Sequence, residues 1–429
     1  MLLGVAKRSF QHEYKIHKKM KLLKLTTAYP IYIRKFYRSR PSLGSHSYNE
    51  QKEKMDYDAY GWADFWSHAL KPLGYDVTEV TINVKPMQLA WARENGIAFS
   101  ERSWLTDIPY EQIRYFKPDI LFVEESSAFT QEWLKKIRDN FPAIQLFITW
   151  CGAPYRDGRV FHSYDLILSC IPEMVAEFVS RGHDSRHVNH AFEPRVLKRI
   201  RLDGPKTIDF SFVGQIARGK QMHIGRERIL QKLATFTDIQ IYSPVKDAQL
   251  AQYLKDLIKG GIRKILSLTR RLGLDLNVTQ SIPGLRELAT LQAELFPPLS
   301  GAIRSKLLPS VFGLAMFQTL RDSKITFNNH IDISPVSASN MRLFEATGVG
   351  SCLVTDWKEN IKELFEPDSE IVTYRTADEC IEKVRWLLDS PGERTKIANA
   401  GQARTLKDHT FRQRAEMLDE IIRQKMKRR

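Results

Sequence analysis

Short apolar runs alternate with segments of helical spacing along most of the chain, and this alternation limits the fold more than any other feature. The runs rarely alternate apolar with polar residues, so they fit strands that are buried on both faces of a parallel sheet. Strands separated by helices are typical of an α/β fold. The strand-like runs of the first half are residues 21–29, 76–84, 119–127, 144–154 and 164–170, and one long helix is expected over residues 48–74, ending at Gly74.

The same rhythm restarts at TIDFSFVGQ (residues 207–215) and predicts a second domain, because 429 residues are too many for one ordinary core. We expect a first Rossmann-like domain over residues 20–195 and a second over residues 206–408. A mostly helical insertion without a clear strand covers about 246–307, and a last helix lies within 409–429. Residues 1–19 are a basic extension, either upstream sequence or a disordered arm. Two doubly wound domains bring the carboxyl ends of both sheets to one central cleft.

The net charge of +15 indicates an anionic partner, which is a nucleotide or sugar diphosphate, an acidic membrane surface or nucleic acid. The four scattered cysteines form no CxxC pair, so they suggest no metal site and fit a reducing cytoplasm. No apolar run reaches the roughly 20 residues that a bilayer crossing requires. We therefore expect a cytoplasmic protein, and the basic termini raise the alternative of peripheral contact with an anionic membrane.

The segment ASNMRLFEATGVG (residues 338–350) follows a polar loop and precedes an apolar run that ends at Asp356. Ser339 is expected to cap a helix that begins at about Asn340. The free backbone N–H groups of its first turn, with the charge of Arg342, would then form an anion site. Glu345 could accept two hydrogen bonds from adjacent hydroxyls, as a ribose presents them. The alternative is a surface helix in which Arg342 and Glu345 form a solvated pair.

The stretch NMRLFEATGVGSCLVTDWKENIKELF (residues 340–365), its continuation to residue 416 and DFSFVGQIARGK (residues 209–220) resemble the glycosyltransferase group 1 family. Within that family they are most similar to the branch related to the spore maturation protein CgeB. The resemblance implies a GT-B fold of two Rossmann-like domains, with the last helix crossing back to the first domain. It also implies transfer of a sugar from a nucleotide-diphosphate sugar to a glycan, lipid, protein or small molecule, without a cofactor.

By the same resemblance Glu345 would hold the ribose, while Arg342 and the amides at the start of its helix would hold the diphosphate. A retaining mechanism does not carry over, because Ser337 stands where related enzymes have the first acid of a Glu-x7-Glu pair. The expected donor-binding residues are Gly214, Gln215, Lys220, Ser339, Asn340, Met341, Arg342 and Glu345.

Glycosyl transfer builds negative charge on the leaving diphosphate, which helix ends and basic side chains can stabilise without a metal. No strand-end Asp-x-Asp is present, and the triplet from Asp56 to Asp58 lies in a predicted helix, where we interpret it as surface charge. An acceptor hydroxyl can need a base, and Glu124 and Glu125 end a strand that faces the cleft. Weaker candidates for the base are Asp157 and His46, and the expected catalytic residues are Glu125, His330 and Arg218.

Other functions also fit parts of the sequence. A basic nucleic-acid-binding protein fits the charge, but no recognised motif supports it, so we expect no nucleic-acid partner. A nucleotide-sugar epimerase would share the two-domain fold, and a catalytically silent sugar or nucleotide binder would retain the same site. Loss of turnover on Glu345→Ala would separate an enzyme from a nucleic-acid binder.

Overall fold

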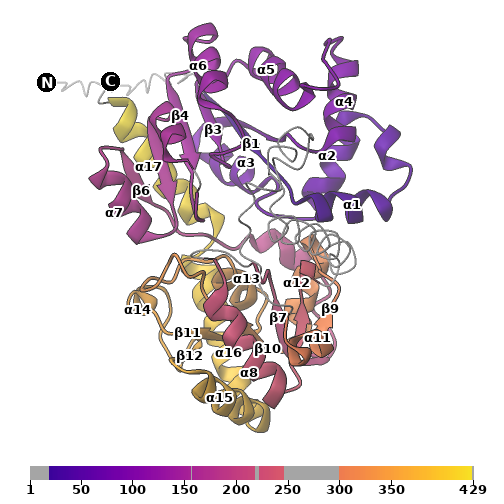
Figure 1. Ribbon diagram of the computed structural model, residues 1–429, viewed down its shortest axis with the longest axis vertical. Helices are drawn as coiled ribbons and strands as arrows, with labels where there is room; N and C mark the ends of the chain where they lie inside the picture. The colour runs from indigo at the N-terminus through magenta and orange to yellow at the C-terminus, as the bar shows by residue number, and fades with distance from the viewer. Residues whose placement is uncertain (1–18, 156, 218–221, 246–298, 428–429) are drawn as a thin grey trace, which may run out of the picture.

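The computed structural model describes residues 19–155, 157–217, 222–245 and 299–427. Two α/β domains lie one above the other in Figure 1, and each is built on a six-stranded sheet. Every strand pair in both sheets is parallel. The predicted fold class of two doubly wound domains is therefore confirmed.

The N-terminal sheet has the strand order β2-β1-β3-β4-β5-β6. Its central strands β3, β4 and β5 are buried at every position, which is why their sequences are apolar without alternation. The strands are β1 (Met20–Thr26), β2 (Tyr75–Thr81), β3 (Ile120–Val123), β4 (Leu146–Trp150), β5 (Leu166–Ser169) and β6 (Ser185–His187).

Seven α-helices and four short 3-10 helices surround this sheet in the described part of the chain. The helix predicted over residues 48–74 is broken in the middle, because Ala59, Gly61 and Ala63 all have positive φ. Gly74 ends this region, as predicted, and adopts the left-handed conformation. The helices are α1 (Pro30–Arg38), α2 (Tyr48–Tyr57), α3 (Phe65–Leu70), α4 (Lys85–Glu94), α5 (Trp104–Phe116), α6 (Gln131–Asn140), α7 (Pro172–Ser180), η1 (Leu43–Ser45), η2 (Lys71–Leu73), η3 (Gly158–Ser163) and η4 (Pro194–Lys198).

The C-terminal sheet has the order β12-β11-β10-β7-β8-β9. Its strands are β7 (Ile208–Val213), β8 (Gln240–Tyr242), β9 (Leu307–Leu308), β10 (Ser323–Asn328), β11 (Cys352–Asp356) and β12 (Val372–Tyr374), and β9 is a strand that the sequence interpretation missed. The accompanying helices are α8 (Ile224–Phe236), α11 (Gly301–Lys306), α12 (Gly313–Asp322), α13 (Arg342–Gly348), α14 (Ile361–Leu364), α15 (Ala377–Asp389), α16 (Pro391–Asp408) and α17 (Phe411–Lys427). Most of the predicted helical insertion, residues 246–298, lies outside the described residues.

Each sheet changes its winding direction beside its first strand. In the N-terminal sheet β1 lies between β2 and β3, and in the C-terminal sheet β7 lies between β8 and β10. At such a switch point the loops after the two flanking strands diverge and leave a crevice at the carboxyl edge of the sheet. The crevices expected from this topology follow β1 and β3 in one domain and β7 and β10 in the other.

Helix α17 returns from the C-terminal domain to the N-terminal domain and packs against α3 (Figure 1). The ring of Phe411 meets those of Phe65 and Trp66 edge-on, with centroids 5.1 and 5.4 Å away. Further along the helix, the Tyr75 hydroxyl donates a 2.7 Å hydrogen bond to Asp419. One hydrophobic cluster consequently extends from the N-terminal sheet through the linker residue Phe192 into α13.

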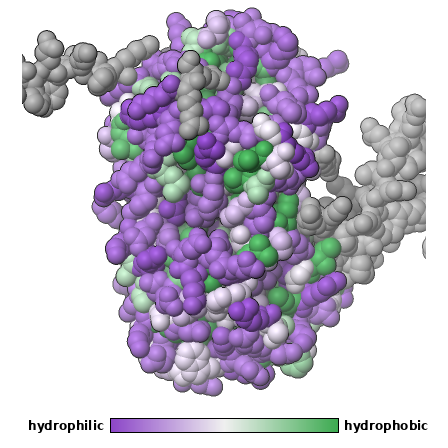
Figure 2. Space-filling model, turned by 90° about the vertical axis from the view of Figure 1, so that its left-hand side faces the viewer, coloured by the Kyte–Doolittle hydropathy of each residue, from purple (hydrophilic) through white to green (hydrophobic). Residues whose placement is uncertain are grey.

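The surface is mostly polar. On the face drawn in Figure 2, hydrophilic residues cover most of the area and hydrophobic residues appear in small separate groups. None of the helices in the described part of the chain combines the length and the apolarity that crossing a bilayer requires.

Candidate functional site

A cavity of about 1200 Å³ lies between the two domains, where the switch points of both sheets meet. Its walls come from loops at the carboxyl ends of the strands and from the beginning of α13. The N-terminal wall includes Thr26–Tyr29, Glu124–Ser127 and Trp150–Tyr155, and the C-terminal wall includes Val213–Gln215, Asn328 and Ser339–Arg342. A cavity of this size and place is the expected position of a ligand site.

Glu345 lies in the C-terminal wall of this cavity and is only 6% exposed. Its Oε2 atom is 2.8 Å from Nη1 of Arg342, one turn earlier on α13. Burial raises the pKa of the Glu345 carboxyl, and the Arg342 guanidinium partly opposes this. The two side chains thus form a buried ion pair at the cavity, and the alternative of a solvated surface pair is wrong.

The start of α13 differs from the prediction. The helix begins at Arg342, two residues later than expected, and its N-cap position is Met341 without a side-chain cap. The expectation that Ser339 caps the helix is wrong, because the Ser339 hydroxyl donates to the hydroxyl of Ser334 at 3.1 Å. Ser339 is buried and lines the cavity, so its observed contact holds the preceding loop together.

Asn340 connects this loop to the end of β10. Its Nδ2 donates a 2.7 Å hydrogen bond to Oδ1 of Asn328, and Nδ2 of Asn328 donates to Thr355 at 2.8 Å. Oδ1 of Asn340 is buried without a hydrogen-bond partner among the described residues. Since Asn340 and Asn328 both line the cavity, this free oxygen can accept a hydrogen bond from a ligand.

Arg226 is a site residue that the sequence interpretation missed. It lies in the first turn of α8, is buried and lines the cavity. Its guanidinium donates to the carbonyls of Gln215 (2.8 Å) and Asn329 (2.5 and 3.1 Å), which joins the loops after β7 and β10. Burial lowers the pKa of Arg226 to about 10, so the group stays charged at neutral pH. The sequence signal that could have indicated it is an arginine in the first turn of the helix that follows the glycine loop.

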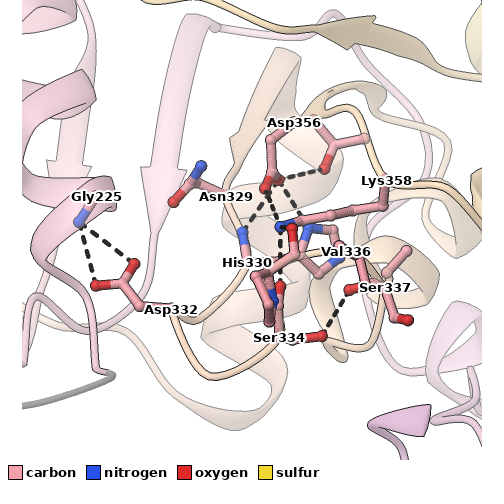
Figure 3. Close-up of polar contacts among 12 residues, drawn as sticks. Gly225, Asn329, His330, Asp332, Ser334, Val336, Ser337, Asp356 and Lys358 are labelled. Carbon is pink, nitrogen blue, oxygen red and sulfur yellow. Dashed lines mark hydrogen bonds and ion pairs between the residues drawn. The ribbon is translucent and has the colours of Figure 1, made fainter. Parts of the chain in front are cut away.

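The loop after β10 is anchored by two aspartates (Figure 3). Asp332 accepts hydrogen bonds from the first backbone amides of α8, at 2.8 Å from Ile224 and 3.3 Å from Gly225. Oδ2 of Asp356 is 3.3 Å from Nζ of Lys358, which also donates to the carbonyls of Ser334 and Pro335 at 2.8 Å. The polypeptide between β10 and α13 is therefore fixed at both ends.

His330 belongs to the same anchor. Its imidazole is fully buried, and Nδ1 is 2.7 Å from Oδ1 of Asp356 (Figure 3). The residue does not line the cavity. This position differs from the expectation that His330 is a catalytic residue, because β10 ends with the imidazole turned to β11.

Ser337, which stands where related enzymes have the first acid of a Glu-x7-Glu pair, takes part in a contact between the domains. Its backbone N–H and that of Val336 donate to the carboxylate of Glu173 on α7, at 3.1 and 3.2 Å. A carboxylate of the N-terminal domain thus stabilises the loop between β10 and α13.

The two glutamates after β3 both line the cavity and differ in their surroundings. Glu125 is exposed and accepts a 2.7 Å hydrogen bond from the Ser127 hydroxyl. Glu124 forms an ion pair with Lys24, with Oε2 2.5 Å from Nζ. Asp157 lines the cavity but pairs with Arg159 at 2.7 Å, and His46 lies outside it.

The other residues predicted for the site lie partly in the cavity wall and partly outside the described residues. Gly214 and Gln215 line the cavity after β7, and Met341 lines it before α13. Arg218 and Lys220 lie outside the described residues. The interpretation of Asp56 and Asp58 as surface charge is wrong, because Asp56 is in the cavity wall and Asp58 accepts a hydrogen bond from Tyr32 at 3.0 Å.

Comparison with known proteins agrees with this architecture. Residues 281–420 match a family model described as glycosyl transferase-like. A comparison with curated protein sequences finds no match.

Solved structures of the same overall shape cover nearly the whole chain. A sucrose-phosphate synthase from Thermosynechococcus elongatus has a TM-score of 0.53 at 9% identity, covering 95% of this chain and 99% of its own. AviGT4, a glycosyltransferase involved in avilamycin A biosynthesis, has 0.51 at 12% identity, covering 96% and 99%. A glycosyltransferase from Rickettsia africae ESF-5 has 0.50 at 10% identity, covering 96% and 100%. The chain therefore has the GT-B fold.

Proposed function

We propose that the protein is a glycosyltransferase that takes a sugar from a nucleotide-diphosphate sugar bound to the C-terminal wall of the cavity. The observation that carries this proposal is the buried carboxylate of Glu345 in that wall, beside the switch point of the sheet. The family match over residues 281–420 includes Glu345 and supports the same conclusion.

The donor-binding part of the proposal rests on charge and hydrogen bonding. Among the described residues, the hydrogen bonds of the buried Arg226 guanidinium go to backbone carbonyls, and Asp356 and Asp332 act on its charge without a direct ion pair. A diphosphate next to it would gain a charge-assisted ionic contact. Glu345 would accept hydrogen bonds from the ribose hydroxyls, with Arg342 holding its carboxylate in place.

During transfer the bond between the anomeric carbon and the diphosphate breaks, and its electron pair stays on the diphosphate. Fixed positive groups that face this developing charge lower the barrier. We propose that Arg226, with Arg218 and Lys220 of the adjoining glycine loop, supplies this charge and that no divalent metal is required. Gly214 and Gln215 would pack against the donor, and Asn340 would add a hydrogen-bond acceptor.

The acceptor would bind to the N-terminal wall. This wall combines carboxylates with aromatic side chains, among them Glu125, Tyr60 and Trp62. Carboxylates accept hydrogen bonds from hydroxyls, and ring faces pack against the apolar face of a sugar. A glycan, a glycosylated lipid or another hydroxyl compound fits these groups. The CgeB-related branch, a hexosyl donor, a cytoplasmic location and contact with an anionic membrane stay predictions.

A thermal-shift screen against nucleoside diphosphates and their sugars tests the proposal. We expect one nucleotide series to raise the unfolding midpoint, because a ligand at 100 times its Kd stabilises the folded state by about 2.7 kcal/mol. Glu345→Ala should weaken binding of that nucleotide roughly 10- to 100-fold and abolish turnover, since about 1.4 kcal/mol corresponds to a factor of ten.

Glu359→Ala, at an exposed position in the same domain, serves as the matched control and should bind the nucleotide normally. Binding of none of the nucleotides, together with salt-sensitive binding of nucleic acid, would refute the proposal.

A further inference from the structure

A buried lysine lies directly behind the N-terminal wall of the cavity. Lys24 is in the middle of β1 and has no exposed surface. Its Nζ is 2.5 Å from Oε2 of Glu124 and 3.3 Å from Oε2 of Glu79. Lys24 and Glu79 are directly opposite each other on paired strands, whereas Glu124 follows β3 on the other side of β1. One ammonium group therefore joins carboxylates from both neighbours of the first strand.

The three charged groups differ in their access to the cavity. Glu79 is buried, and its Oε1 accepts a 2.7 Å hydrogen bond from the backbone amide of Ser67. Glu124 lines the cavity, and a quarter of its side-chain surface is exposed. Lys24 also lies 5.2 Å from the ring centroid of Trp62, another wall residue. Only Glu124 of the three can reach a molecule in the cavity.

Stability alone does not explain why Lys24, Glu79 and Glu124 are grouped in this way. Removing three charged groups from water costs free energy that their attraction only partly returns, and apolar residues of similar size often stabilise a protein at least as well. Burial by itself would lower the pKa of Lys24, but Glu124 and Glu79 raise it above its usual value. The ammonium group therefore stays charged at neutral pH, and its 2.5 Å contact holds Glu124 in one orientation at the switch point.

We propose that Glu124 is the catalytic base that receives the acceptor hydroxyl, and that Lys24 is the positioning residue that fixes its carboxylate. This inference rests on the proposed transferase function and specifies its acceptor side. The acceptor is then a compound that presents a hydroxyl to a carboxylate held by an ammonium group. Glu125, although adjacent, hydrogen-bonds to the exposed Ser127 and has no comparable fixed partner among the described residues.

The proton and the electron pairs balance in this step. The acceptor oxygen forms a bond to the anomeric carbon, the bond from that carbon to the diphosphate breaks, and its electron pair leaves with the diphosphate. The hydroxyl proton passes to Glu124. Burial raises the pKa of Glu79 to about 7, and Lys24 opposes this rise. Above that pH Glu79 remains as the anionic partner of Lys24, so the buried ammonium keeps a counter-ion while Glu124 is neutral. This accounts for the presence of two carboxylates around one lysine.

The test measures release of nucleoside diphosphate from the nucleotide-sugar that stabilises the protein most, with a panel of alkyl and aryl glycosides as acceptors. Glu124→Gln retains the size of the side chain but removes the base. We expect it to lower kcat by about 10²- to 10⁴-fold and to leave the Kd for the nucleoside diphosphate within a factor of three. Glu53→Gln, at an exposed position on α2, is the control.

The role of Lys24 is tested in the double variant Lys24→Met/Glu79→Gln, which removes one positive and one negative charge together. Without the ammonium the Glu124 carboxylate loses its fixed partner, so kcat should fall by about 10-fold or more while the Kd for the nucleoside diphosphate stays within a factor of about three. A purely structural lysine would lower the amount of folded enzyme without lowering kcat for the enzyme that remains folded.

The outcomes separate the two proposals. If the wild-type protein binds no nucleotide, the proposed function itself fails. If nucleotide binding is normal and Glu124→Gln has nearly wild-type turnover, or if Glu125→Gln alone causes the loss, the assignment of Glu124 is overturned while the proposed function stands. An unchanged kcat in the folded double variant refutes the role of Lys24. Should the double variant not fold, Glu124→Gln still decides the assignment of the base.

Discussion

Asp356 illustrates how single side chains hold the proposed donor loop in place. Burial alone would raise the pKa of its carboxyl, but His330, Lys358 and a hydrogen bond from the His330 backbone lower it to about 2. A carboxyl whose pKa is lower in the folded state than in the unfolded state stabilises the fold at pH values above its unfolded-state pKa, which is near 4. That stability is lost as the pH falls from about 4 towards 2.

We predict that Asp356→Asn lowers the free energy of unfolding by about 2 kcal/mol at pH 6, because a pKa shift of one unit corresponds to about 1.4 kcal/mol. The difference between variant and wild type should shrink below pH 4, where the wild-type carboxyl itself becomes protonated. Urea denaturation at pH 6 and pH 3 measures both values. Asp76→Asn, at an exposed position, is the control, and an Asp356→Asn difference that is equal at both pH values would contradict the prediction.

At the scale of elements, α13 is the structural centre of the C-terminal half of the site. Six of its seven residues, Leu343–Gly348, are buried, so it is enclosed on almost all sides. The Thr347 hydroxyl is 2.6 Å from that of Thr405 on α16, which fixes the helix from behind. A Cβ atom on Gly348 would come within 2.4 Å of the Phe192 ring in the interdomain linker. The glycine therefore permits close contact between the helix and the linker.

Gly348→Ala should consequently destabilise the protein by about 1–3 kcal/mol, the usual cost of an extra methyl group in a packed core. The matched control is Gly392→Ala in the first turn of α16, where a new Cβ would meet nothing within 4 Å. The control should be neutral or slightly stabilising, because alanine is the better helix former. Chemical denaturation of both variants measures the effect, and equal stabilities would show that the linker yields to the added methyl.

At the scale of the whole molecule, the two domains are joined by one hydrophobic cluster that includes α17. Phe411 begins this helix, is 3% exposed and packs among Trp62, Phe65 and Trp66. Trp62 is also a wall residue of the cavity, so the return of the chain supports the proposed acceptor side. The position of α17 thus connects folding of the last helix to the shape of the site.

Phe411→Ala is predicted to cost about 3–5 kcal/mol, the usual range for truncation of a buried phenylalanine. Met417→Ala on the same helix is the control, because Met417 is 40% exposed, and it should change stability by less than about 0.5 kcal/mol. Urea unfolding followed by tryptophan fluorescence reports on the ring cluster directly. A Phe411→Ala protein as stable as the control would mean that α17 contributes little to the joined core.

The amino-acid sequence by itself determined the fold class, because strands buried on both faces must be apolar and helices between them must have one apolar side. It also indicated Arg342 and Glu345 as candidate site residues, since a charged pair at the beginning of a helix between two buried strands is unusual for a surface segment. The broken helix over residues 48–74 and the strand β9 were not predictable in the same way. Three positive φ values and a two-residue strand leave almost no periodic signal.

The tertiary structure alone decided which polar groups meet. Lys24, Glu79 and Glu124 are up to 100 residues apart, and their contact follows from strand order, which local patterns do not encode. The same holds for Arg226, whose partners lie on two loops brought together at the switch point, and for His330, which turns to Asp356. A residue type and its neighbours in sequence predict the chemistry that a side chain can perform. Only the packing of strands and helices determines whether that side chain is directed to the cavity, paired behind its wall or buried away from it.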